Sequence, residues 1–415
     1  MNTTTLSADN KTASIGPGAR WGDVYRVLSP LGYGVPGGRA STVGVAGLTT
    51  GGGNSFYAAR FGFVCDNVKN FEVVLGNGTV VDANANENPD LWKGLKGSHG
   101  NLGIVSRFDI VTFAATPLWG GVAFYSGYDA VFATLKPFVD FANQIAQNPF
   151  GSLIQLYFHT PADNQITQLN LYEYTGNATE KKYYTHLESD NAPQVFPTPF
   201  ENFTFVGPMG KPVSNTLRIA EQGNLTDELV LPPNFYNIFG PALFSANLTV
   251  LTEVNQIFRR IIQPYLEDPK SAPYIQAQVQ FQPIPRVFSD HSAERGGNVM
   301  GLDRYPDNNI LLLTVLVWTD PGKSAEVQRL NDYILGNITT YTKSVGAFKP
   351  WQYINYAYEN QDPFGSYGPE NVDFLKRVSR EYDPQQTFQK LVPGGFKLGD
   401  AGARREDLNF NQFIY

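Results

Sequence analysis

Three side chains near the C-terminus have types and spacing that could do chemistry. The stretch "YINY" places Tyr353, Asn355 and Tyr356 close together. A phenol titrates near about 10 when free, so a tyrosine base needs a neighbouring positive charge or hydrogen bonds to act near neutrality. On its own, the stretch is better explained as aromatic core. Tyr353 is nonetheless our candidate for the residue that moves a proton.

A second feature is a piece of backbone with many glycines and almost no charge. It is "RASTVGVAGLTTGGGNSF", from Arg39 to Phe56, and it holds five glycines. Glycine lets the backbone approach another group closely, and successive amides in such loops bind anions. The run could therefore hold phosphates or carry a flat cofactor. Turns packed against the protein's own core explain it about as well.

A third feature is a strand with a face of amides. The alternation in "YIQAQVQFQ" predicts a half-buried strand. Its apolar face consists of Ile275, Ala277, Val279 and Phe281, and its amide face of Gln276, Gln278, Gln280 and Gln282. The amide face could line a substrate cavity or face solvent, and the two alternatives weigh equally. Gln278 and Gln280 are the better substrate candidates because they are central.

The elements that must position these residues change in character along the chain. Residues 1–115 are rich in predicted strands and tight turns, and "FEVVLGNGTVVDA" predicts a hairpin that turns at Gly76 to Gly78. The stretch "RWGDVYRVLSPLG" predicts a helix that Gly32 ends. The apolar side of that helix would carry Trp21, Val24, Leu28 and Leu31.

Residues 116–345 predict an antiparallel sheet backed by long helices. Asp129 to Gln147 forms an amphipathic pattern, Asn247 is a candidate N-cap for a further helix, and Ile310 to Trp318 predicts a buried strand. Residues 346–415 are rich in aromatic and turn residues and end with one more helix and a polar tail. The predicted class is α+β.

Composition narrows the classes of partner. The 415 residues carry a formal net charge of −7 and show no basic stripe, which argues against nucleic acid. No apolar run is long enough to span a bilayer. A single cysteine excludes an intrachain disulfide framework and a cysteine-rich metal site, and we predict no metal.

Signals for localisation conflict. Glycosylation sequons begin at Asn2, Asn77, Asn177, Asn202, Asn224, Asn247 and Asn337. They indicate the secretory pathway, although a chain rich in Asn and Thr shows several by chance. The start "MNTTTLSADNK" has neither the charged nor the apolar part of a signal peptide.

Several long motifs, taken in order, resemble one family. They include "PGARWGDVYRVL", "GYGVPGGRASTVGVAGLTTGGGNSFYAARFGFVCDNV", "GSHGNLGIVSRFDI", "GGNVMGLD" and "YINYAYENQDPFGSYGPEN". Together they resemble the FAD-linked oxidases of the vanillyl-alcohol oxidase/p-cresol methylhydroxylase (PCMH-type) superfamily, in the berberine-bridge-enzyme-like branch common in fungi. The resemblance covers nearly the whole chain. It implies a PCMH-type FAD-binding domain built from the N- and C-terminal segments, with a middle substrate domain.

The resemblance also assigns roles to individual positions. It places Tyr353 as the base, with Asn355 and Tyr356 beside the flavin. The implied flavin contacts are Pro36, Gly37, Gly38, Thr42, Val43, Gly44, Val45, Gly47, Gly51, Gly52, Gly103, Ile104 and Val105.

The chain departs from the family at several points. The family's pyrophosphate loop, with a histidine that bonds covalently to the flavin, would lie upstream of these residues, so we expect an N-terminal truncation or a lost lobe. Ala40 stands where some relatives attach flavin through a cysteine, and Leu48 where some have a further histidine. Cys65 is expected to be a small buried hydrophobe. His99 suits a structural loop role slightly better than a bond to the cofactor.

Arg39 could offset flavin or phosphate charge, and a surface arginine is about as probable. The expected activity is transfer of a hydride from an alcohol, sugar or secondary metabolite to flavin N5, with reoxidation by O2. An oxidative cyclase and a non-catalytic remnant are the alternatives. We expect a monomer that acts on a small molecule and, in full-length form, a secreted protein.

Overall fold

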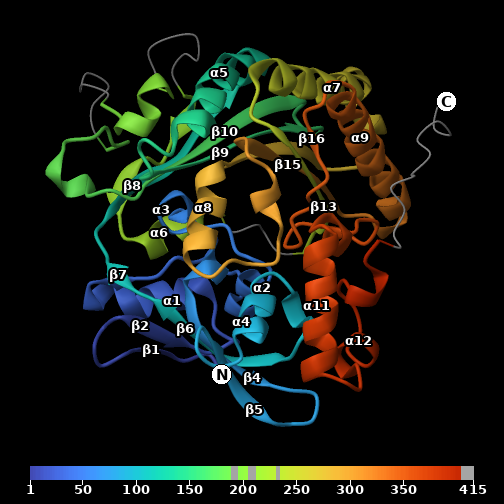
Figure 1. The fold of residues 1–415 in the computed structure, drawn as a ribbon. Coiled ribbons are helices and arrows are strands. Elements are labelled where there is room, and N and C mark those ends of the chain that lie inside the picture. Colours follow the sequence, from blue (N-terminus) through green and yellow to red (C-terminus); the bar gives the residue numbers. More distant parts are fainter. Residues whose placement is uncertain (188–194, 204–211, 230–233, 403–415) are drawn as a thin grey trace.

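The computed structural model describes residues 1–187, 195–203, 212–229 and 234–402. Two sheets dominate these residues, a small one built near the N-terminus and a large one built from the middle of the chain (Figure 1). Short helices and loops fill the space between them. The α+β class predicted from the sequence is confirmed.

The small sheet is antiparallel throughout. In spatial order its strands are β1 (Thr4–Leu6), β2 (Thr12–Ile15), β6 (Ile104–Val111), β4 (Val68–Val74) and β5 (Val80–Asn84). The predicted hairpin is β4 and β5, and Gly78 adopts φ +83°, where a side chain would be strained. A short pair, β3 (Tyr33–Gly34) and β7 (Phe113–Ala114), lies beside it.

The large sheet is antiparallel as well. Its strands run in the order β11 (Ser214–Asn215), β8 (Leu118–Ser126), β10 (Gln165–Tyr174), β9 (Gly151–Thr160), β14 (Gln276–Ile284), β15 (Asn309–Trp318), β13 (Tyr236–Ser245) and β16 (Phe348–Lys349), and β12 (Arg218–Ala220) also pairs with β8. The alternating glutamine stretch is β14 and the buried apolar stretch is β15, as predicted. Both lie in the interior of the sheet, which places the amide row at its centre.

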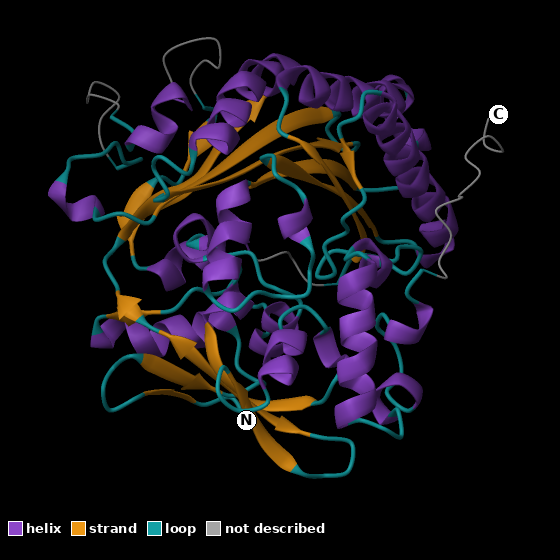
Figure 2. Ribbon diagram, viewed as in Figure 1, coloured by secondary structure: helices purple, strands orange, loops and turns teal. Residues whose placement is uncertain are grey.

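Three long helices cover the outer face of the large sheet (Figure 2): α5 (Tyr128–Gln144), α7 (Leu248–Glu267) and α9 (Ser324–Ser344). The Phe281 ring of β14 meets Phe138 of α5 at 6.3 Å between centroids, so the apolar side of β14 faces these helices. Because side chains alternate along a strand, its glutamines face the opposite way, toward the small sheet. The N-cap predicted at Asn247 is confirmed, since its Oδ1 accepts the Val250 N–H at 3.2 Å.

The shorter helices lie mainly between the sheets and along the C-terminal segment. They are α1 (Trp21–Leu28), α2 (Val45–Thr50), α3 (Ala58–Phe61), α4 (Pro89–Leu95), α6 (Gln222–Thr226), α8 (Arg286–Glu294), α10 (Pro363–Ser366), α11 (Pro369–Tyr382) and α12 (Thr387–Lys390).

The first predicted helix is shorter than expected. Trp21, Val24 and Leu28 are fully buried, but α1 ends at Leu28 and Leu31 is exposed. A 3-10 turn with Pro30 follows, and Gly32 closes it at φ +79°. Proline cannot donate the next helical hydrogen bond, so the apolar stripe stops one turn early.

The C-terminal segment returns to the N-terminal part (Figure 1). The Tyr382 hydroxyl at the end of α11 donates to Asp90 Oδ1 of α4 at 2.8 Å, and Asn101 Nδ2 donates to the Phe396 carbonyl at 3.0 Å. The two ends of the chain therefore share contacts, as the resemblance implies. The boundaries 1–115, 116–345 and 346–415 remain predictions.

Candidate active site

Tyr353 lies where the C-terminal segment meets the glycine-rich run. Its side chain is almost completely buried, and its hydroxyl oxygen accepts the N–H groups of Gly53 at 3.0 Å and Asn54 at 2.9 Å. Asn355 Nδ2 donates to the same oxygen at 3.0 Å. Burial is the main cause that raises the pKa of Tyr353 above its usual range, against smaller lowering effects that include the Asn355 bond and the charge of Arg39. The phenol thus holds the backbone of the glycine-rich run in place.

Asn355 holds the same run from a second side. Its Nδ2 also donates to the carbonyls of Leu48 and Gly51, each at 3.1 Å. Its Oδ1 lies 3.0 Å from His99 Nε2. Burial lowers the pKa of His99, so this imidazole is neutral at pH 7 and its bond fixes the amide rather than a charge. The structural role expected for His99 fits this contact.

Arg39 connects three distant parts of the chain. Its Nη2 donates to Gln282 Oε1 of β14 at 2.5 Å and to the Tyr356 hydroxyl at 3.0 Å. Gln282 Nε2 donates to the same Tyr356 oxygen at 3.3 Å, and Asn54 Nδ2 approaches Gln282 Oε1 at 3.4 Å. Arg39 is only 8% exposed, so the surface alternative is wrong. A buried guanidinium stands beside a phenol.

The amide row continues from this cluster along β14. Gln278 Nε2 donates to Gln280 Oε1 at 3.3 Å, and both side chains are partly exposed on the face that carries Gln282. Phe239 of β13 meets the Tyr356 ring edge to face at 6.2 Å. This face therefore combines amides with aromatic rings opposite the glycine-rich run. Substrate contact by Gln278 and Gln280 remains a prediction.

The predicted flavin-contacting glycines fall into two groups. For Gly37, Gly38, Gly51, Gly52 and Gly103, the space where a Cβ would stand is already filled by the protein's own side chains. The Trp21 ring, for example, occupies the space that a Cβ on Gly37 or Gly38 would need. Pro36 is buried beside them. These positions therefore fit the alternative in which the glycines pack against the protein's own core.

The second group faces open space. A Cβ on Gly44 or Gly47 would meet no heavy atom within 4 Å among the described residues. Thr42, Val43, Gly44 and Gly47 are all exposed, while Val45 is buried beneath them at the start of α2. On strand β6 of the small sheet, Ile104 is exposed and Val105 is buried. If backbone meets a cofactor in this run, Thr42 to Gly47 is where it is free to do so.

Cys65 lies in a separate buried cluster. Its Sγ is 3.7 Å from Asp66 Oδ1, and burial raises the pKa of the thiol well above its usual range. Asp66 accepts bonds from Phe63 N–H, Ser292 and Asn298. Lys96 lies nearby, its ammonium 3.4 Å from the centre of the Trp92 ring. The expectation that Cys65 is a small buried side chain is met by this geometry.

Two members of the Arg39 cluster are not among the site residues that the sequence predicted. Gln282, the end of the amide row, and Asn54, the first polar residue after the glycines, both join the Arg39 cluster. The available signal was Arg39 itself, because a lone charge in an uncharged run needs polar partners if the run is buried.

The residues present fit an FAD molecule. FAD is rich in acceptors: two phosphates and the flavin carbonyls. The run offers exposed backbone with no side chains in the way at Gly44 and Gly47. Thr42, Gly44 and Gly47 would hold the cofactor.

The described residues show neither a metal site nor a membrane-spanning helix. Within the described ranges, no three histidine, cysteine or acidic side chains gather as a metal site would require. Over the same ranges, no helix combines the length and apolar character needed to cross a bilayer.

Comparisons with known proteins agree with this geometry. Residues 1–84 match the family described as FAD binding domain. The chain is 33% identical over 404 residues to the FAD-dependent monooxygenase sdcF of Emericella nidulans, covering 97% of this chain and 80% of that protein. It is 35% identical to the FAD-dependent monooxygenase tpcD of Cochliobolus heterostrophus, covering 93% of this chain and 72% of that protein.

Solved structures show the same fold at lower identity. The xylooligosaccharide oxidase of Myceliophthora thermophila gives a TM-score of 0.69 at 20% identity, covering 95% of this chain and 81% of that chain. The wild-type BBE-like 1 protein of Physcomitrella patens gives a TM-score of 0.67 at 18% identity, covering 93% of this chain and 78% of that chain.

The fold and the site thus define an FAD-linked oxidoreductase. More narrowly, the chain belongs to the same family as the FAD-dependent monooxygenases sdcF and tpcD, and it shares its fold with the BBE-like 1 protein.

Proposed function

We propose that this protein oxidises a hydroxyl-bearing small molecule, an alcohol, sugar or secondary metabolite, and that dioxygen is the final electron acceptor. The observation that carries the proposal is the Tyr356 phenol, which receives bonds from the Arg39 guanidinium and from Gln282 on the inner face of the large sheet. As the phenolate, whose charge the neighbouring guanidinium would balance, this oxygen can accept the proton that a hydroxyl loses on oxidation.

The two phenols have different access. The sequence points to Tyr353 as the base, but in the structure three N–H groups already occupy its buried oxygen. Tyr356 is partly exposed on the amide face and lies against Phe239. We therefore assign proton transfer to Tyr356 and positioning of the run to Tyr353.

When bound, FAD supplies the two-electron acceptor for the hydride of the substrate carbon and passes both electrons to dioxygen, which leaves as hydrogen peroxide. The chain's own residues do the rest. Gln278 and Gln280 orient polar groups of the substrate, Phe239 covers an apolar part, and the Tyr356 oxygen receives the hydroxyl proton. Arg39 holds that oxygen in place.

Monooxygenation is the second candidate. The observation that favours it is identity above 30% to relatives named FAD-dependent monooxygenases. In that reaction one oxygen atom of dioxygen enters the product and the other leaves as water, so a separate two-electron donor is consumed.

One experiment separates the two. The purified protein is loaded with FAD, checked for bound flavin by its visible absorbance, and given a panel of sugars, alcohols and aromatic polyketides under dioxygen labelled with the heavy isotope. An oxidase forms peroxide in equal amount to product, and the product carries no label. Label in the product would replace the oxidase proposal by monooxygenation. Failure of the protein to retain flavin would overturn both.

A further inference from the structure

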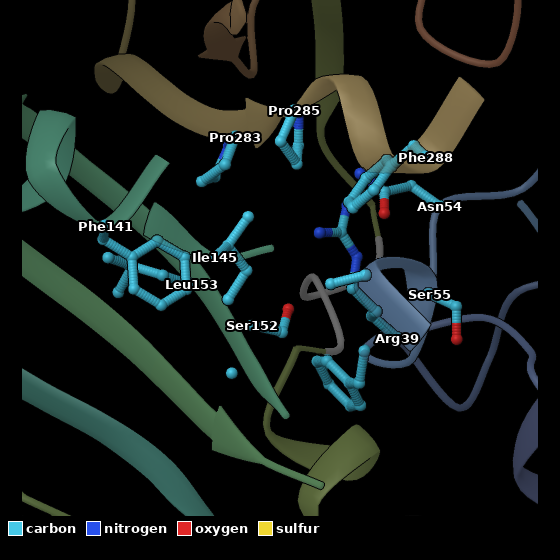
Figure 3. A pocket seen from close by; sticks show the side chains of 13 residues that line it. Arg39, Asn54, Ser55, Phe141, Ile145, Ser152, Leu153, Pro283, Pro285 and Phe288 are labelled. Atoms are coloured by element: carbon cyan, nitrogen blue, oxygen red, sulfur yellow. The ribbon is translucent and has the colours of Figure 1, made fainter. Parts of the chain in front are cut away.

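A small cavity lies beside Arg39, between the N-terminal part and the ends of the central strands β9 and β14 of the large sheet (Figure 3). It is walled by rings and aliphatic groups, among them Phe56, Phe141, Leu153 and Phe288. These come from elements far apart in the chain: the loop before α3, α5, β9 and α8. The cavity is partly open, and its volume is about 20 Å³.

The only charged side chain that lines this cavity in the described part of the chain is Arg39. Figure 3 shows its guanidinium pointing into the hollow, with the Ser152 hydroxyl of β9 turned toward the same space. The two hydrogen bonds of Arg39, to Gln282 Oε1 and to the Tyr356 oxygen, both use Nη2. The N–H groups on Nη1 and Nε are therefore available to the cavity.

Charge makes this arrangement costly as it stands. An arginine only 8% exposed is normally paired with a carboxylate or another anion, because a desolvated charge without a partner is destabilising. While Tyr356 carries its proton, both partners of Arg39 are neutral groups, and no carboxylate lies within ion-pair distance among the described residues. The cavity is thus rich in donors, apolar elsewhere, and short of one negative charge.

We propose that this cavity is a binding site for one small monovalent anion, held by the Nη1 and Nε groups of Arg39 and by the Ser152 hydroxyl. Size sets the class. A cavity needs about 10–15 Å³ of such volume to hold one water molecule, so the space at Arg39 takes a single ion of about that size, such as a halide or formate. A whole organic substrate does not fit.

The same charge could come from two sources. One is a free ion from solution. The other is the carboxylate end of a substrate that enters along the amide row, since Gln282 belongs to both the row and the Arg39 cluster. The second source rests on the proposed function, whereas the first does not.

The test uses the purified full chain loaded with FAD. Thermal unfolding is followed in sodium gluconate, chloride, bromide, formate and acetate at constant ionic strength. Binding raises the midpoint with saturation at millimolar concentrations, by about 2 °C at ten times the dissociation constant. General salt effects instead grow steadily into the molar range.

Matched variants locate the site. Arg39→Met should abolish the halide-dependent shift and Arg39→Lys should keep part of it. Arg260→Met, which removes an exposed arginine paired with Glu253 on α7, should leave it unchanged. Should Arg39→Met not fold, a bromide anomalous signal beside Arg39 in crystals of the unaltered protein gives the same answer.

Each outcome either identifies the source of the anion or overturns the proposal. A saturable shift with halides assigns the free ion. A shift with formate and acetate but not with halides assigns the carboxylate end of a substrate. An equal midpoint in all salts, with no bromide at Arg39, means that the cavity holds water and overturns the proposal. None of these readouts requires turnover, so failure of the proposed oxidation leaves the result intact.

Discussion

Tyr353 and Tyr356 stand three positions apart and use their hydroxyl groups differently. The first is buried and accepts bonds from the backbone of the glycine-rich run, and the second is half-buried and accepts from Arg39 and Gln282. Removing each oxygen in turn therefore separates the support of the site from its chemistry.

For Tyr356→Phe we expect a fall in turnover of about 10²–10⁴-fold with little change in melting temperature, because a positioned base contributes about that much. For Tyr353→Phe we expect loss of about 1–3 kcal/mol of stability, because buried N–H groups lose their acceptor. Steady-state kinetics and urea unfolding of both variants check this. Normal turnover in Tyr356→Phe would return proton transfer to another group.

The buried Lys96 side chain leads to a prediction of how the stability of the protein depends on pH. Burial is the main cause that lowers its pKa from 10.5 to about 8 in the folded protein. Between pH 8 and 10.5 the unfolded chain binds more protons at this site, so stability rises with pH there and is lost again as pH falls through 8. The gain approaches about 3 kcal/mol in full.

The measurement compares Lys96→Met with the unaltered protein in urea at pH 7 and pH 10. The difference in unfolding free energy should move in favour of the unaltered protein at pH 10. Subtracting the variant removes the opposite trend of the buried tyrosines, whose raised pKa values cost stability above about pH 10. A difference that stays constant would show that the Lys96 ammonium is well solvated.

At the scale of elements, the glycine-rich run consists of two consecutive parts, one open and one enclosed by other side chains. Its first part, through α2, leaves Gly44 and Gly47 open, and its second part is enclosed by His99, Asn355 and Met300. Sequence pattern alone gave no way to separate them, since every glycine looks alike until its neighbours are known.

We expect Gly47→Ala to leave the melting temperature of the FAD-free protein unchanged and to weaken FAD binding by about tenfold, equal to about 1.4 kcal/mol. Gly51→Ala is the matched partner, because its Cβ would clash with Asn355 Oδ1 and His99 Nε2. That variant should lose about 1–3 kcal/mol of stability through overpacking. Flavin titration and thermal unfolding of both proteins decide. Equal behaviour of the two would contradict the division of the run.

Regular elements could be predicted where local signals were strong. The β4–β5 hairpin follows from glycine at its turn, the cap of α7 from Asn247, and β14 from strict alternation. The first helix was predicted too long because the apolar spacing of Leu31 outweighed Pro30. Local pattern cannot show which way a strand's polar face turns, so the direction of the glutamines had to come from the structure.

At the scale of the whole molecule, the site is assembled from all three parts of the chain. Arg39 comes from the N-terminal part, Gln282 from the large sheet, and Tyr356 from the C-terminal segment. No sequence window contains such a cluster, and only the resemblance to a family linked Arg39 and Tyr356 to the same cofactor. Gln282 and Asn54 escaped even that, because their bonds are tertiary.

Gln282→Leu should therefore weaken the contact between the large sheet and the N-terminal part of the chain. The side chain is fully buried, and its loss removes a partner of the Arg39 guanidinium, at a cost of about 1–3 kcal/mol. In urea, we expect flavin release to precede the loss of helical signal in this variant, whereas both coincide in the unaltered protein. Gln278→Leu, on the same strand face but bonded to Gln280 rather than to the N-terminal part, is the control. Coinciding transitions in both variants would argue against this coupling.

The bonds between the Tyr353 hydroxyl and the glycine-rich run also affect the order of events while the chain is being synthesised. The Tyr353 oxygen is bonded to the N–H of Gly53, 300 positions earlier in the chain. At about 5–20 residues per second, a ribosome needs about 15–60 s to make that stretch. During this interval the glycine-rich run is outside the ribosome while the phenol that fixes it does not yet exist. Pulse-labelled nascent chains should therefore capture flavin only after the C-terminal segment has emerged.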